Sequence, residues 1–125
     1  RRRRHRADIG AAIEDVALAH GYGVVRSLVG HGIGTEMHEE PQVPNYRTGS
    51  RGRRIEVGLC LAIEPMFTLG SHEVRVKADG WTVETRDGSL AAHWEHTLAV
   101  TAVIVYLMVY VVMMIILYAV GGFTE

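Results

Sequence analysis

Cysteine is nearly absent from this 125-residue chain, which contains only Cys60. A single cysteine excludes an internal disulfide framework and is typical of a protein from a reducing compartment. Cys60 stands among apolar neighbours, which favours the role of a small core residue. The chain also has no H-E-x-x-H segment and no C-x-x-C pair, so these two short zinc-binding signatures are excluded.

Basic residues are scarce over most of the chain. The formal net charge is −1, yet residues 1–6 alone contribute five arginines. Residues 7–101 carry eight basic and thirteen acidic side chains. An acidic body argues against nucleic acid as a partner. The arginine run is expected to form a solvated basic tail over residues 1–7, or to be a sequence artefact.

Charge is absent altogether from residues 102–120. As a helix this segment would extend about 28 Å, close to the hydrocarbon thickness of a bilayer, so a membrane anchor is one interpretation. No Lys or Arg flanks the segment, and its many Val and Ile residues also suit strands. A foreign sequence and a buried strand therefore stay open as alternatives, and residues 121–125 are expected to be a short tail.

Hydrophobic periodicity predicts one amphipathic helix over residues 9–20. Asp8 can cap its start, and Gly21 provides a left-handed stop. The stretch 24–29 is predicted to be a strand. Residues 39–54, which contain prolines, glycines and arginines, are predicted to be a loop.

Two further predicted strands each carry a carboxylate. Residues 55–65 alternate large apolar side chains with small ones, and Glu64 extends from the small-residue face. Residues 91–101 place Glu95 in a strand of mostly uncharged residues. Burying a carboxylate is costly unless it is paired, hydrogen-bonded or bound to a metal. Between these strands, an Asp-Gly turn predicts a hairpin over residues 73–85.

Three glycines alternate around His31, which leaves room for a ligand or a metal beside the backbone. A bend around a satisfied core histidine is the alternative. His31, His38, Glu64 and Glu95 form a set of imidazoles and carboxylates at or next to strands. These ligand types suit Mn, Fe, Co or Zn, and two ions about 3.5–4 Å apart can hold a water and polarise a carbonyl for hydrolysis.

Several short motifs also follow one another in a single order between residues 8 and 101. They are Gly30-His31-Gly32-Ile33-Gly34, Met37-His38-Glu39-Glu40-Pro41, Val43-Pro44-Asn45-Tyr46, Ala62-Ile63-Glu64-Pro65, Asp79-Gly80-Trp81 and Trp94-Glu95-His96-Thr97. Together they resemble the C-terminal half of a type I methionine aminopeptidase. The short connection between His38 and Glu64 leaves no room for the long insertion that is typical of type II enzymes.

The resemblance implies an α/β (α+β) fold that is half of a pita-bread aminopeptidase fold. In it, an antiparallel sheet with a helix packed on it forms residues 8–101, and a second, similar half completes a dinuclear metal site. By the same resemblance, His31, Glu64 and Glu95 would be metal ligands, with Glu95 bridging both ions. The cofactors implied are two divalent metal ions, which could be Co, Mn, Fe or Zn.

The resemblance also implies two catalytic residues, His38 and Glu64. His38 would hydrogen-bond the scissile amide and the developing charge, and Glu64, or a metal-bound water beside it, would handle proton transfer. His38, Trp81 and Met37 would be the substrate-binding residues, the last two lining a pocket for a methionine side chain. A packed hairpin aromatic is the alternative for Trp81.

The activity that follows is removal of N-terminal methionine from nascent polypeptides in the cytoplasm. The family takes two aspartate ligands and another histidine from its N-terminal half, and nothing before Asp8 can supply them. Because the first residue is Arg rather than Met, we expect a fragment that has little or no activity alone. Uncovered sheet and helix surfaces would favour self-association.

Three alternatives stay open. A non-catalytic pita-bread binding module would be expected to lose His31, Glu64 or Glu95, and all three are present. The Met-His-Glu-Glu-Pro and Val-Pro-Asn-Tyr segments argue against the related prolidases and creatinases. A membrane-tethered inactive fragment is supported by the apolar run of residues 102–120.

Overall fold

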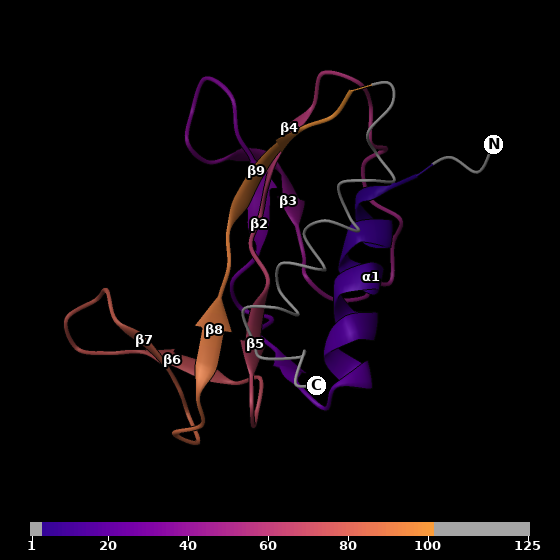
Figure 1. Cartoon of the computed structure of the whole chain (residues 1–125). Coiled ribbons are helices and arrows are strands. Elements are labelled where there is room, and N and C mark those ends of the chain that lie inside the picture. The colour runs from indigo at the N-terminus through magenta and orange to yellow at the C-terminus, as the bar shows by residue number, and fades with distance from the viewer. Residues whose placement is uncertain (1–3, 102–125) are drawn as a thin grey trace, which may run out of the picture.

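The computed structural model describes residues 4–101, and in that part of the chain one helix is followed by nine strands (Figure 1). The elements are α1 (Arg6–Ala19), β1 (Gly23–Val24), β2 (Gly30–Gly32), β3 (Glu39–Val43), β4 (Cys60–Ile63), β5 (Met66–Thr68), β6 (Val74–Val76), β7 (Val83–Thr85), β8 (Ala91–His93) and β9 (His96–Ala99). A helix packed on antiparallel strands is the mixed α+β class that the sequence predicts.

The strands form three antiparallel sheets. Their orders are β3-β2-β4-β9, β1-β5-β8 and β6-β7. β4 runs on into β5, and β8 into β9, so the two larger sheets share one long, bent pair of chain segments, here called the ribbon (Figure 1). Glu64 and Glu95, the two carboxylates predicted to lie on strands, both lie on this ribbon where it passes from one sheet to the other.

Helix α1 confirms the predicted helix but begins earlier, at Arg6. Asp8 lies inside the first turn, where its Oδ2 accepts the backbone N–H of His5 at 2.8 Å. Asp8 therefore caps the helix from within rather than by preceding it. At the other end Gly21 takes a φ of 72°, the left-handed stop that was expected.

The predicted basic tail is folded at its C-terminal end. His5 forms a β-bridge with Arg54, and the backbone N–H of Arg6 donates to the carbonyl oxygen of Arg53 at 3.0 Å. Two stretches of arginine that are far apart in the sequence thus lie side by side, because backbone pairing holds them together.

One face of α1 covers the hydrophobic core. Ile13 is the central side chain of this face and is 1% exposed. The buried cluster joins the helix to both larger sheets and consists of Ile9, Ile13, Ala17, Val24, Val43, Leu61, Ile63 and Phe67. Leu18, on the outer face of the helix, is 64% exposed.

Several strands differ from the predictions. The predicted strand 24–29 is wrong over most of its length: β1 and β2 are separated by bends, and β2 includes His31. The predicted loop 39–54 begins with β3, whose proline is tolerated because β3 is an edge strand. The predicted strand 55–65 is reduced to β4, since Gly58, with a φ of 92°, turns the chain just before it.

The predicted hairpin is confirmed as β6 and β7, which project from the body on the side away from α1 (Figure 1). Asp79 closes its tip: Oδ1 accepts the backbone N–H groups of Trp81 at 3.0 Å and Thr82 at 2.9 Å. Gly80 supplies the positive φ, 71°, that the turn requires. The hydrogen bonds from Thr82 and Trp81 hold the pKa of Asp79 below its usual value.

The predicted strand 91–101 is two strands. β8 ends before Trp94 and β9 begins after Glu95, and the two strands belong to different sheets. The alternation of side chains continues unbroken from β8 into β9, so this pattern alone does not reveal the change of sheet.

The apolar segment 102–120 and the tail 121–125 lie outside the described residues. Across residues 4–101, no helix combines the length and the apolar character needed to cross a membrane. The membrane anchor stays a prediction.

We expect Ile13→Ala to lower the free energy of unfolding by about 2–5 kcal/mol, because it leaves a cavity between α1 and the sheets. Leu18→Ala is the matched control on the outer face of the same helix, and it should change stability by no more than about 0.5 kcal/mol. Urea denaturation followed by circular dichroism measures both. Equal losses from the two variants would contradict the packing of α1.

Candidate metal centre

Glu64 and Glu95 face each other across the ribbon. The strand register is the same for β4 with β9 and for β5 with β8, so Glu64, which follows β4, lies opposite Glu95, which precedes β9. The N–H of Trp94 donates to the carbonyl oxygen of Pro65 at 3.1 Å. The next pair along, Glu64 with Glu95, is therefore a non-hydrogen-bonded pair, the arrangement that brings opposed side chains closest. Like charges opposed in this way repel each other.

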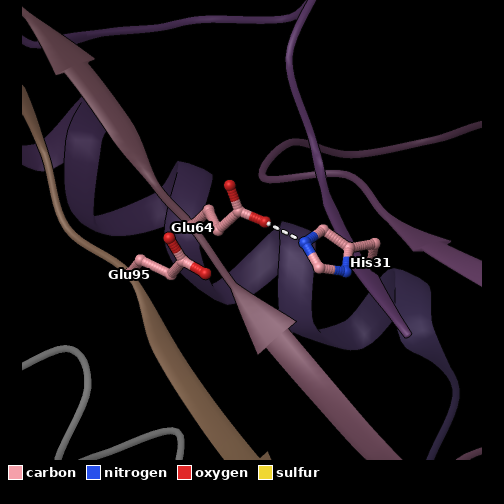
Figure 2. A group of neighbouring side chains, drawn as sticks. All are labelled: His31, Glu64 and Glu95. Atoms are coloured by element: carbon pink, nitrogen blue, oxygen red, sulfur yellow. Dashed lines mark ion pairs between the residues drawn. The ribbon is translucent and has the colours of Figure 1, made fainter. Parts of the chain in front are cut away.

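His31 joins the two carboxylates from the neighbouring strand β2 (Figure 2). Its Nε2 lies 3.0 Å from Oε1 of Glu64, and the two side chains are only 12% and 13% exposed. Its Nδ1 lies 2.7 Å from the carbonyl oxygen of Gly32. A carbonyl can only accept, so Nδ1 carries a proton, and Nε2 is the ring nitrogen turned toward Glu64.

The buried Oε1 of Glu64 receives no hydrogen bond within the described part of the chain. Its nearest polar neighbour is Nε2 of His31, at 3.0 Å. When the ring is neutral, with its proton on Nδ1, two lone pairs face each other across this distance. Such a contact is stable only when a proton or a cation lies between the two atoms.

The charges around Glu64 also indicate that it needs a proton or a cation. Burial raises the pKa of the Glu64 carboxyl above its ordinary value, and the facing Glu95 carboxylate raises it further. His31, His93 and His38 lower the pKa of Glu64 by smaller amounts. The negative charge of Glu64 is thus poorly compensated by the protein alone.

One imidazole nitrogen and two carboxylate oxygens converge here. Ligand atoms of His31, Glu64 and Glu95 all lie within 4.8 Å of one another, and Glu95 is exposed, so the group opens to solvent on its side. This donor set suits Mn, Fe, Co or Zn. Nε2 of His31 and Oε1 of Glu64, 3.0 Å apart, are close enough for one ion to bind both. The residues present therefore fit a divalent metal.

The alternate glycines beside His31 have a different role from the one predicted. A Cβ at Gly30 would lie 2.3 Å from the carbonyl oxygen of Ala62, and one at Gly32 would lie 2.4 Å from that of Glu40. The space is taken by the backbones of the flanking strands β4 and β3 rather than left for a ligand. The glycines bring the strands close enough to set His31 beside Glu64.

Two other histidines lie close to this group. The ring of His38 is centred 4.2 Å from that of His31, at an interplanar angle of 46°. Nε2 of His93 lies 3.7 Å from Oε2 of Glu64. His93 was not predicted as a site residue, although it precedes Glu95 by two positions, the spacing that places side chains on one face of a strand.

A cleft of about 920 Å³ opens beside these residues. His31, His38, Glu64 and His93 contribute to its wall. Much of the remaining wall is aliphatic and includes Val25, Leu28, Val29, Met66, Val83 and Leu90. A polar group next to an aliphatic cleft suits a ligand with one reactive polar end and an apolar side chain.

Met37 and Trp81, the predicted pocket residues, are not brought to this cleft. Neither contributes to its wall, and they are 71% and 88% exposed. Trp81 follows the turn that Asp79 caps at the tip of the projecting hairpin, and Met37 lies among bends between β2 and β3. Their contact with a substrate stays a prediction.

The model of the family described as metallopeptidase family M24 matches residues 1–102. The chain belongs to metallopeptidase family M24. Within the family it is 53% identical over 93 residues to a methionine aminopeptidase of Clostridium acetobutylicum, a match that covers 74% of this chain and 37% of that protein. It is 52% identical over 94 residues to the methionine aminopeptidase of Borreliella burgdorferi, covering 74% and 38%.

Solved structures of family members agree with the fold. A methionine aminopeptidase from Thermotoga maritima superposes with a TM-score of 0.76 at 45% identity, over 79% of this chain and 40% of that one. The enzyme from Rickettsia prowazekii gives 0.75 at 43% identity, over 81% and 41%. The predicted half of a pita-bread fold is confirmed for the described residues, and this M24 chain spans about two-fifths of the length of the relatives it matches.

Glu64 should make the metal-free M24 chain less stable as the pH rises. Because its pKa is raised on folding, the native state holds a proton more tightly than the unfolded state, and this stabilisation is lost as the pH passes through the folded-state pKa. We expect Glu64→Gln, whose amide can donate to Nε2 of His31, to be more stable than the wild type at pH 7. The difference should shrink toward pH 4 in urea titrations.

Glu73→Gln is the matched control, because Glu73 is an exposed carboxylate outside the cleft. It should change the free energy of unfolding by less than about 0.5 kcal/mol. A Glu64→Gln variant less stable than the wild type at pH 7 would show that its charge is compensated.

Proposed function

We propose that this chain carries the metal-binding half of an aminopeptidase that removes N-terminal methionine from nascent polypeptides in the cytoplasm. The observation that carries the proposal is the convergence of the opposed Glu64 and Glu95 with Nε2 of His31. A second line of support is the name shared by the family members at about 50% identity.

In this proposal His31, Glu64 and Glu95 hold divalent ions, two in the complete site, for which Co, Mn, Fe and Zn are all suitable. When bound, such ions polarise a carbonyl and make water a better nucleophile. Because the carbonyl of Gly32 holds Nδ1 of His31, Nε2 is the ring atom that would bind the ion.

The remaining roles fall to the chain's own polar groups. Glu64, whose pKa is raised by burial and by Glu95, is suited to accept a proton from water and to return it to the leaving amine. His38, beside His31 at the cleft, would hydrogen-bond the scissile amide. The aliphatic wall of the cleft would receive the methionine side chain, with Met37 and Trp81 contacting it once the rest of the pocket is in place.

We further propose that a segment corresponding to the part of the relatives that this chain does not match completes the site. The chain covers 37% of the Clostridium acetobutylicum enzyme, and apolar side chains at its cleft, such as Leu90, are largely exposed. Covering these side chains would remove apolar surface from water. When the chain is alone, the same surface would favour self-association, and activity would be weak or absent.

Metal analysis after dialysis against Co(II) or Mn(II) tests the proposal. We expect at most one weakly held ion per chain, together with little or no release of methionine from a Met-Ala-Ser peptide. His31→Ala should lower metal affinity at least about tenfold, because it removes a ligand. The matched control His72→Ala changes an exposed histidine outside the cleft and should bind metal as the wild type does.

Two results would overturn different parts of the proposal. Metal binding that His31→Ala leaves intact would place the ion elsewhere and remove the candidate centre. Two tightly held ions with rapid methionine release would show that the chain needs nothing further to complete its site.

A further inference from the structure

Asn45 is a fully buried polar residue that has no part in the proposed chemistry. Its exposure is 0%, and its Nδ2 donates to the backbone carbonyl oxygen of Glu64 at 2.9 Å. The assignment of the amide follows from chemistry, since the carbonyl of Glu64 can only accept and Nδ2 is the donor atom of the Asn45 side chain. The hydrogen bond joins two residues that are 19 positions apart in the sequence.

The carbonyl of Glu64 needs this donor because of its place on the ribbon. The hydrogen-bonded pairs of the ribbon fall at Leu59 with Val100 and at Pro65 with Trp94. Residues at the alternate positions, including Glu64, therefore turn their backbone groups away from β8 and β9. β2 ends its pairing with β4 at His31 and Ala62, so it does not extend to Glu64. A buried carbonyl without a donor would be costly, and Asn45 supplies the donor.

Helix α1 in turn holds the segment that carries Asn45. A Cβ at Gly10 would lie 2.4 Å from the carbonyl oxygen of Tyr46 and 2.5 Å from that of Pro44, so the helix backbone lies directly on both neighbours of Asn45. The buried Glu14, one turn further along α1, accepts the backbone N–H of Arg47 at 2.9 Å. The segment is thus fixed to the helix on either side of the amide.

We propose that Asn45 is a positioning residue, which fixes the backbone of Glu64 so that its carboxylate meets His31 and Glu95. The path runs from α1 through the segment 44–47 to Glu64, which lies between β4 and β5 where the ribbon passes from one sheet to the other. The inference rests on the proposed metal centre for its use, but the positioning of Glu64 against His31 can be measured without metal.

The test compares two hydrogen bonds that buried side chains donate to backbone carbonyls. Asn45→Leu keeps the shape of the side chain and removes its donor. Thr68→Val is the matched control: Thr68 is 1% exposed and donates from Oγ1 to the carbonyl of Gly70 at 3.1 Å, which lies on a different strand end. Both variants should be destabilised, since each removes a hydrogen bond donated by a buried side chain.

If Asn45 positions Glu64, the two variants should differ at the metal centre even when they lose similar stability. In the metal-free protein, we expect Asn45→Leu to shift the ¹⁵N resonance of His31 Nε2, because Glu64 moves away from it. With Co(II), the visible absorption of the folded variant should change in intensity, and its metal affinity should fall about tenfold. Thr68→Val should match the wild type in all three measurements.

An Asn45→Leu variant that behaves like Thr68→Val would overturn the positioning role. Should Asn45→Leu fail to fold, Asn45→Ala serves instead, since it removes the donor without adding bulk. If the wild type binds no Co(II), this chain alone does not hold the metal, while the His31 resonance still decides whether Asn45 positions Glu64.

Discussion

The opposition of two carboxylates across paired strands is the constraint on which the site depends. Glu64 and Glu95 occupy a pair with no backbone hydrogen bonds between them, where the side chains come closest. The protein offers little to neutralise them: the facing Glu95 raises the pKa of Glu64, and the buried Oε1 of Glu64 receives no hydrogen bond within the described residues. Repulsion of this kind is normally avoided in a sheet. Here it makes sense as a binding site for a cation, in agreement with membership of a metallopeptidase family.

The surrounding architecture serves to hold this arrangement in place. Glu64 falls where the ribbon leaves one sheet and enters the next, so its carbonyl lies outside the regular ladders and depends on a side chain, that of Asn45. Glycines at 30 and 32 bring three strands within close contact, which sets His31 next to Glu64. Helix α1 provides the base, since its core face and its close approach at Gly10 fix the loop behind the ribbon.

Some elements could be predicted because their signals are local. The hairpin of residues 73–85 follows from an Asp-Gly turn whose side chain caps its own tip, and α1 follows from its apolar spacing. Other elements could not. β3 has a polar sequence with a proline and is a strand only because β2 lies beside it. The predicted strand 91–101 divides between two sheets at Glu95, and alternation is the same on both sides of that division.

The sequence by itself determined the chemical types of the site, His31, Glu64 and Glu95, because these polar residues stand in apolar or glycine-rich surroundings and in motifs that resemble one family. Only the tertiary structure decided which atoms meet. Strand register placed Glu64 opposite Glu95, and a hydrogen bond to the carbonyl of Gly32 selected the tautomer of His31. The contacts of His93 and Asn45 with Glu64 were decided by the tertiary structure for the same reason: contacts between distant strands and loops depend on packing, which no local pattern encodes.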